Sequence, residues 1–294
     1  MSIGLMSMVN ILFALLIAPL LDGFERKVRA RLQNRQGPPI MQSWYDLIKL
    51  FKRPCVLPKG SIRSLYVYAP YVTFASILAG YLIVSTLLPA SLKFVGDFIV
   101  LAYLLTFSTF VSSLGAFSSG NPYAQVGSNR EVSLFMSEEL VLAFIIVIVA
   151  VVGGGVGFAA LFPLPFKISS ILALGLLFLV IYVSSARVPF DIPEAEPEII
   201  EGPLIEYSGR HLGLMNYSLF LKRLLLYSLF LNFVLPKEIG VRTAGYLIGL
   251  VVLSIIYSSL EAYYGRFRID QGIGLMKKLS IVALFVWLVC IAGW

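Results

Sequence analysis

The segment Val132–Phe158 reads VSLFMSEELVLAFIIVIVAVVGGGVGF, a long apolar run whose only charged residues are Glu138 and Glu139. Crossing the hydrocarbon core of a bilayer takes roughly 20 mostly apolar residues in an α-helix, because each residue advances about 1.5 Å and every backbone polar group must be bonded internally. The segment therefore predicts a transmembrane helix. The whole chain agrees: 59% of its 294 residues are hydrophobic and 13% are charged, against roughly 45–50% and about 25% in soluble domains. The expected fold class is an all-α integral membrane protein.

The sparse polar residues exclude several functions. The net charge of +7 is explained by the Lys and Arg residues that set the orientation of a membrane protein. No nucleic acid partner is therefore expected. Cys55 and Cys290 are far apart and lack metal-ligand spacing, so neither a disulfide framework nor a thiolate metal site is indicated. His211 is the only histidine, which argues against a metal centre or histidine-based catalysis in this chain.

Eight segments satisfy the length and hydropathy criterion for a membrane span. We therefore expect one polytopic membrane domain over residues 1–294 with eight transmembrane helices. These are Ile3–Leu21, Leu65–Leu88, Phe98–Phe117, Val132–Phe158, Ile168–Ala186, Leu212–Leu235, Thr243–Leu260 and Leu279–Trp294.

The basic residues are divided unequally between the two sides of the predicted membrane domain. Of the 23 Lys and Arg residues, 17 fall in four alternate connections, at about 22–64, 118–131, 187–211 and 261–278, and 4 fall on the opposite side. Cytoplasmic connections carry the excess of Lys and Arg. The distribution predicts that these four connections are cytoplasmic and that both termini are outside.

The first cytoplasmic connection combines a basic run with an amphipathic segment. After a Gly-Pro-Pro turn, apolar residues recur at helical spacing from Met41 through Trp44 to Phe51, which predicts an interfacial amphipathic helix. The basic run could serve only topology and anionic lipid. It could also form a docking surface for a soluble partner. The candidate docking residues are Arg26, Lys27, Arg29, Arg31 and Arg35.

The connection Val188–Arg210 is acidic on a face that is otherwise basic. Crowded carboxylates can share protons near neutral pH, as a proton entrance requires. A solvated loop is the alternative, although the interleaved apolar residues favour a packed one. The acidic residues concerned are Asp191, Glu194, Glu196, Glu198, Glu201 and Glu206.

Four ionisable residues lie within predicted spans, Glu138 and Glu139 in the fourth and Lys222 and Arg223 in the sixth. Each charge near the bilayer centre costs about 2.5–3.5 kcal/mol on insertion scales, so such residues are expected to face a protein interior or a wet cavity. Glu139 and Lys222 could simply neutralise each other, or they could form a proton or ion relay. Adjacent helical residues point about 100° apart, so Glu138 and Glu139 cannot both face one cavity equally. Glu139 is the preferred relay member.

Several strings in these connections resemble a known family. ERKV-x-AR-x-Q-x-R-x-GP at Glu25–Pro38, DLIKL at Asp46–Leu50 and PFD-x-PEAE-x-E at Pro189–Glu198 resemble subunit 1 of respiratory complex I. EGPL-x-EYSG at Glu201–Gly209 and G-x-x-R-E at Gly127–Glu131 resemble the homologous subunit of membrane-bound [NiFe] hydrogenases, the branch that includes formate hydrogenlyase and sulfane sulfur reductase.

This resemblance implies a non-catalytic membrane-anchor and coupling subunit in the cytoplasmic membrane. It implies no redox cofactor in this chain, with iron–sulfur clusters and a [NiFe] centre in peripheral-arm partners, and antiporter-like subunits among the membrane partners. The basic run would dock the peripheral arm, and electron transfer would be linked to proton or sodium translocation. The implied path comprises Asp191, Glu194, Glu196, Glu201, Glu206, Glu138, Glu139 and Lys222.

Two other functions compete with this one. The nearest rival is a quinone-site subunit of a complex I-type NADH or ferredoxin oxidoreductase, which predicts sensitivity to quinone-site inhibitors. A stand-alone secondary ion transporter would place Glu139 and Lys222 in its substrate site. Such transporters are often built from internal repeats, and the two halves of this chain lack convincing similarity.

Overall fold

The computed structural model describes residues 3–84, 97–158, 163–193, 200–236 and 238–293, and in these ranges it contains helices and no β-strand. The helices are α1 (Ile3–Leu32), α2 (Gln42–Lys52), α3 (Arg63–Ile83), α4 (Asp97–Phe117), α5 (Pro122–Gly153), α7 (Ile168–Ser184), the short 3-10 helix η1 (Gly202–Leu204), α9 (Gly209–Val234), α10 (Ile239–Tyr263) and α11 (Ile269–Ile291).

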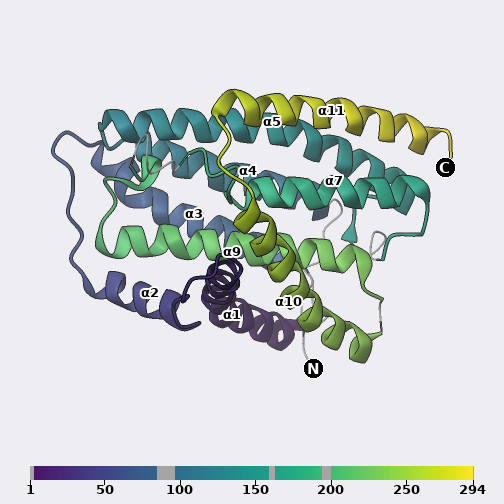
Figure 1. Cartoon of the computed structure of the whole chain (residues 1–294), viewed down its shortest axis with the longest axis horizontal. Helices are drawn as coiled ribbons and strands as arrows, with labels where there is room; N and C mark the ends of the chain where they lie inside the picture. Colours follow the sequence, from purple (N-terminus) through teal and green to yellow (C-terminus); the bar gives the residue numbers. More distant parts are fainter. Residues whose placement is uncertain (1–2, 85–96, 159–162, 194–199, 237, 294) are drawn as a thin grey trace.

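The helices form one bundle with α9 at its centre. Figure 1 shows α3, α4, α5, α7, α9 and α11 running side by side, with α1 and α10 together along one edge. The α9 helix packs against α1, α2, α3, α7 and α10, and its Leu221, Leu224, Leu225 and Tyr227 are completely buried. Buried residues recur along the whole length of α9, as this central position requires, and its Lys222 and Arg223 are the charged residues in the middle of the helix.

Seven of the described helices are long and apolar enough to cross a membrane, namely α1, α3, α4, α5, α9, α10 and α11. The α7 helix is also apolar but has only 17 residues. The prediction of an all-α membrane fold is confirmed at this level.

Three helices extend at least ten residues beyond their predicted spans. The α1 helix continues past Leu21 to Leu32, α5 begins at Pro122 instead of Val132, and α11 begins at Ile269 instead of Leu279. Hydropathy detects only the apolar part of a helix, whereas the polar ends of these helices are stabilised by caps and ion pairs. At the start of α5, the Asn121 side chain accepts a hydrogen bond from the Tyr123 N–H at 2.8 Å, as an N-cap residue does.

The amphipathic helix predicted after the Gly-Pro-Pro turn is α2. Its Ile48 and Phe51 are exposed on the bundle surface, and the Trp44 indole donates a hydrogen bond to the Leu16 carbonyl at 3.3 Å. Ser43 is buried and donates a hydrogen bond to Asp22 at 2.7 Å. The helix is therefore tied to α1 by a polar contact that the hydrophobic pattern does not reveal.

Candidate functional site

A partly open cavity lies within the bundle, between α3, α4, α5, α7 and α9 and next to residues 186–193 and 203–204. We call it the inner cavity; its volume is about 100 Å³, and its ionisable lining residues are Glu131, Glu138 and Lys222. One water needs roughly 10–15 Å³ of such space. The lining residues with hydroxyl groups include Ser108 and Thr109 of α4 and Ser218 of α9. The cavity therefore has both the room and the polar groups to hold several water molecules.

Polar contacts hold the ionisable groups of the inner cavity in place. The Lys222 ammonium lies 3.3 Å from the Thr109 hydroxyl, and the Ser113 hydroxyl donates to Glu131 at 3.1 Å. Glu138 is 5% exposed. Buried ionisable groups gathered around space for water are the arrangement that proton relays use.

The two glutamates of the inner cavity lie seven residues apart on α5, which places them on one face of the helix. Glu131 was not among the site residues predicted from the sequence, although its spacing to Glu138 was a usable signal. Glu139, the preferred relay member, does not line this cavity; its carboxylate lies 2.6 Å from the Thr106 hydroxyl of α4. Lys222 therefore shares the inner cavity with Glu138, whereas Glu139, the other half of the alternative ion pair considered from the sequence, contacts Thr106.

A second, strongly charged hollow, the vestibule, lies where α1, α9 and α10 meet the loop that follows α7. It consists of two cavities with five lining residues in common. The charged residues lining it are Asp22, Glu25, Arg26, Arg29, Arg35, Arg187, Asp191, Glu201, Arg223, Glu261 and Arg266. Leu204 and Leu219 line both the vestibule and the inner cavity, as does Ala186, so the two cavities are adjacent.

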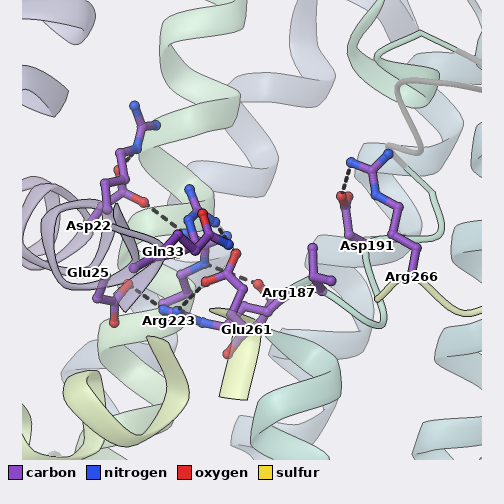
Figure 2. Close-up of polar contacts among 12 residues, drawn as sticks. Asp22, Glu25, Gln33, Arg187, Asp191, Arg223, Glu261 and Arg266 are labelled. Carbon is purple, nitrogen blue, oxygen red and sulfur yellow. Dashed lines mark hydrogen bonds and ion pairs between the residues drawn. The ribbon is translucent and has the colours of Figure 1, made fainter. Parts of the chain in front are cut away.

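Arg187 is the centre of the ion-pair network in the vestibule (Figure 2). Its guanidinium is 1% exposed, pairs with Glu25, and lies 3.2 Å from the Glu261 carboxylate; it also donates to the Tyr227 hydroxyl at 2.8 Å. Burial disfavours the charged guanidinium, but the facing carboxylates outweigh this and raise the pKa of Arg187 above its ordinary value. Arg187 therefore stays charged and links α1, α9 and α10 through Glu25, Tyr227 and Glu261.

Asp22 is a second centre in the same network. Its carboxylate lies 2.8 Å from the guanidinium of Arg223 and 2.8 Å from that of Arg26, and it accepts the hydrogen bond from Ser43. Arg223 also donates to the Ser185 carbonyl at 3.1 Å. The sequence flagged Arg223 as a charge inside a span, and its partners explain how that charge is accommodated.

The predicted docking residues fall into two groups. Arg26 is paired with Asp22, and Arg29 is paired with Glu261. Arg31 and Arg35 are exposed, with Lys27 half-buried. A partner could bind Arg31, Arg35 and Lys27 without breaking any ion pair between described residues.

The predicted acidic residues are also separated by the structure. Asp191 pairs with Arg266 at 2.6 Å, apart from the Arg187 cluster in Figure 2, and both line the vestibule with the exposed Glu201. Glu206 lines none of these cavities and accepts a hydrogen bond from the Asn121 side chain. Glu194 and Glu196 lie outside the described residues, as does Glu198.

Two glycines let the loop carrying these acids lie against the bundle. A Cβ atom on Gly127 would lie 2.7 Å from Pro203 and 2.8 Å from Gly202, so η1 packs directly on α5. Gly209 has a φ of +54° and lies against the Pro54 carbonyl. Positive φ and close backbone approach are conditions that favour glycine. Both belong to the strings that resemble the hydrogenase branch.

Within the described residues, His, Cys, Asp and Glu form no group of three or more that could hold a metal ion. The carboxylates of the vestibule are instead engaged by arginines. This donor set suits ion pairing and water, and the arrangement offers no thiolate ligands for an iron–sulfur cluster.

The long apolar helices, together with the ionisable groups inside the bundle, define a multi-pass membrane protein with an internal polar site. Comparison with known sequences identifies its family. The NADH dehydrogenase family matches residues 5–292, and the chain belongs to this family of complex I subunit 1 proteins.

The curated relatives include hydrogenase subunits. Formate hydrogenlyase subunit 4 of Escherichia coli K12 is 33% identical over 258 residues, covering 84% of this chain and 82% of the relative. Hydrogenase-4 component C of the same organism is 34% identical over 229 residues, covering 76% and 72%. A chain of the membrane-bound sulfane sulfur reductase, an archaeal respiratory membrane complex, shares the fold with a TM-score of 0.89 at 24% identity, covering 99% of this chain and all of that one.

Proposed function

We propose that this chain is the membrane-anchor and coupling subunit of a hydrogenase-type respiratory complex related to complex I. In this proposal it holds a peripheral catalytic arm at the cytoplasmic face and links electron transfer there to ion translocation. The chain itself carries no redox centre; iron–sulfur clusters and a [NiFe] centre belong to the peripheral subunits. Further partners are membrane subunits, including antiporter-like ones.

The observation that carries this proposal is the inner cavity. Glu138 is buried, and the half-buried Glu131 and Lys222 line the same space for water, next to residues 186–193 and 203–204 of the connection that would face the peripheral arm. A structural role alone does not require two carboxylates and an ammonium inside a bundle, because each costs about 2.5–3.5 kcal/mol to insert. We assign these groups, together with Glu139, to the intramembrane part of the path.

The vestibule supplies the connection to the cytoplasm in this proposal. Protons enter among Asp191, Glu201 and the neighbouring ion pairs, and they reach the inner cavity past Leu204 and Leu219. A charge change in the bound arm alters the proton affinity of nearby carboxylates, because the charged form of an acid is favoured by positive and disfavoured by negative neighbours. Redox turnover is thereby coupled to proton occupancy. Glu194, Glu196 and Glu206 remain predicted members of the entrance.

The proposed topology has eight spans with both termini outside the cytoplasmic membrane. The α7 helix serves as the eighth span: 17 residues at about 1.5 Å each give about 26 Å, against a hydrocarbon core of about 30 Å. Arg187 follows this helix directly and lies on the same side as the basic first connection. The distribution of Lys and Arg residues supports this orientation.

A quinone-site subunit is the second candidate, and the apolar part of the inner cavity favours it. Phe190, Pro203 and Leu204 contribute to that lining. However, sites for drug-sized ligands measure roughly 300–1,000 Å³, whereas the inner cavity measures about 100 Å³. We therefore expect turnover of the native complex to be insensitive to quinone-site inhibitors.

The proposal is tested by purifying the chain from native membranes in mild detergent and identifying the co-migrating subunits and metals. We expect a stable complex that contains iron, nickel and further membrane subunits. Recovery of a monodisperse single chain with transport activity would contradict the proposal and favour a stand-alone transporter. Inhibition by quinone analogues in the intact complex would favour the quinone-site candidate.

A further inference from the structure

Lys222 brings a positive charge to the inner cavity that is not consumed in an ion pair. Its ammonium lies 3.3 Å from the Thr109 hydroxyl, and in the part of the chain that the structure describes it pairs with no carboxylate. The next residue of α9, Arg223, differs, because it is paired with Asp22 at 2.8 Å. The charge of Lys222 therefore acts on the cavity and on any ion that enters it.

The ammonium shares the inner cavity with two carboxylates. Glu131 and Glu138 line the cavity together with Lys222. An ammonium group and a sodium ion carry the same charge and bind the same oxygen atoms. Because the ammonium has three N–H donors, it engages acceptors that a sodium ion would need as ligands, among them the Thr109 hydroxyl. Lys222 is thus a monovalent cation that is fixed covalently to α9.

A proton and a sodium ion make different demands on this cavity. A proton needs one carboxylate oxygen, with which it forms an O–H bond, and the resulting carboxyl group is neutral. A sodium ion needs several oxygen ligands at once, and transporters supply them from the carbonyl groups of unwound or broken helices. Here the ionisable groups lie on α5 and α9, which are continuous helices, so their main-chain carbonyls are bonded within the helix.

We propose that Lys222 makes the inner cavity selective for protons over sodium ions. Its ammonium repels a second cation and occupies oxygen ligands of that cation, whereas a proton binds a carboxylate without displacing the ammonium. This inference rests on the proposed function, because it names the ion that uses the path assigned there. Sodium transport by the complex, where it occurs, belongs to other subunits.

The test is whether sodium ions protect Glu138 from a carbodiimide in the intact complex. Dicyclohexylcarbodiimide modifies protonated carboxyl groups in apolar surroundings, and a sodium ion bound to the carboxylate blocks this reaction. Labelling is carried out at one pH, in sodium chloride and in choline chloride of equal ionic strength. Mass spectrometry with fragmentation follows the labelling of Glu131 and Glu138 separately in the wild type, Lys222→Met and Lys222→Arg.

In the wild type, we expect the same labelling rate in both salts. In Lys222→Met, which removes the charge and keeps an unbranched side chain, sodium should slow the labelling of Glu138 severalfold. Lys222→Arg keeps a cation and should remain insensitive to sodium. Glu139 lies outside the inner cavity, so its labelling is the internal control.

A second measurement covers the case in which the carbodiimide does not reach the cavity. The infrared band of protonated carboxyl groups is recorded before and after sodium is added. Sodium should remove the contribution of Glu138 in Lys222→Met and leave it in the wild type, and Lys222→Met/Glu138→Gln assigns that contribution. Lys222→Gln serves as the neutral variant if Lys222→Met does not assemble.

Two outcomes overturn the inference. One is protection of Glu138 by sodium in the wild type, and the other is a neutral variant at position 222 that is as insensitive to sodium as the wild type. The proposed function is judged by a different measurement, ion translocation in Glu138→Gln. Sodium protection in a wild-type complex whose translocation depends on Glu138 would keep the path and change its ion, so the two claims can fail independently.

Discussion

At the scale of single residues, the distinction between Glu138 and Glu139 is the main result. The sequence identified both as ionisable groups inside a span, and their difference in direction follows from helix geometry. Which one faces the interior depends on where α4, α7 and α9 pack against α5, and periodicity within one helix does not contain that information. The structure places Glu138 with Lys222 and Glu139 with Thr106.

The residue with the largest expected effect on stability is Arg187. Replacing it in Arg187→Met leaves the buried Glu25 without its cation and leaves Glu261 paired with Arg29 alone, and breaking a buried pair in this way costs about 3–5 kcal/mol. We expect a clear loss of resistance when the purified complex is titrated with sodium dodecyl sulfate. The matched control is Arg266→Met, which breaks the more exposed pair with Asp191 and should cost at most about 1 kcal/mol. Equal effects of the two substitutions would contradict the assignment.

At the scale of elements, the apolar parts of the helices were predictable and their polar ends were not. The predicted span Phe98–Phe117 closely matches α4, whereas α1 and α5 each continue for several more turns. The continuation of α1 carries Asp22 and Glu25 to partners on α9 and after α7. These are contacts between residues far apart in the sequence, so local pattern analysis could not supply them.

The close packing of η1 on α5 makes Gly127 a test at this scale. A Cβ atom there would meet the backbone of Gly202, so Gly127→Ala should destabilise the complex by about 1–3 kcal/mol, as overpacking does. In the control Gly175→Ala, no atom lies within 4 Å of the new Cβ, and helix propensity predicts no loss or a gain of up to about 1 kcal/mol. Detergent-denaturation midpoints of the two variants provide the measurement. A Gly127→Ala complex as stable as the wild type would show that η1 can move away freely.

At the scale of the whole molecule, composition and motifs were sufficient for the class and the family. An apolar fraction of 59% identified a membrane protein, and the strings around Glu25 and Glu206 pointed to complex I subunit 1 and its hydrogenase branch. The arrangement in space of the residues assigned to the ion path could not be predicted from composition and motifs. Glu131 belongs to the G-x-x-R-E string, but the string does not indicate its place in a cavity. The ion-pair network around Arg187 joins residues that are far apart in the sequence, so only the three-dimensional structure reveals it.

Docking of the peripheral arm is also a property of the whole molecule. Because Arg31 and Arg35 are exposed, their joint replacement in Arg31→Glu/Arg35→Glu should release the arm while the membrane domain stays folded. Co-purification of the peripheral subunits with this chain is the readout. Lys167→Glu, a charge reversal at the other end of α7, should leave co-purification unchanged. If the arm is recovered undiminished with the double variant, the basic run serves membrane topology alone and does not dock the arm.

The most direct test of the account is the number of ions translocated per electron pair by the complex carrying Glu138→Gln, measured in sealed vesicles beside the wild type. The substitution keeps the shape of the side chain and removes its ability to carry a proton. We predict an assembled complex with its full set of subunits and redox centres, in which ion translocation is lost. Wild-type translocation at wild-type turnover in this variant would contradict the assignment of the inner cavity to the ion path.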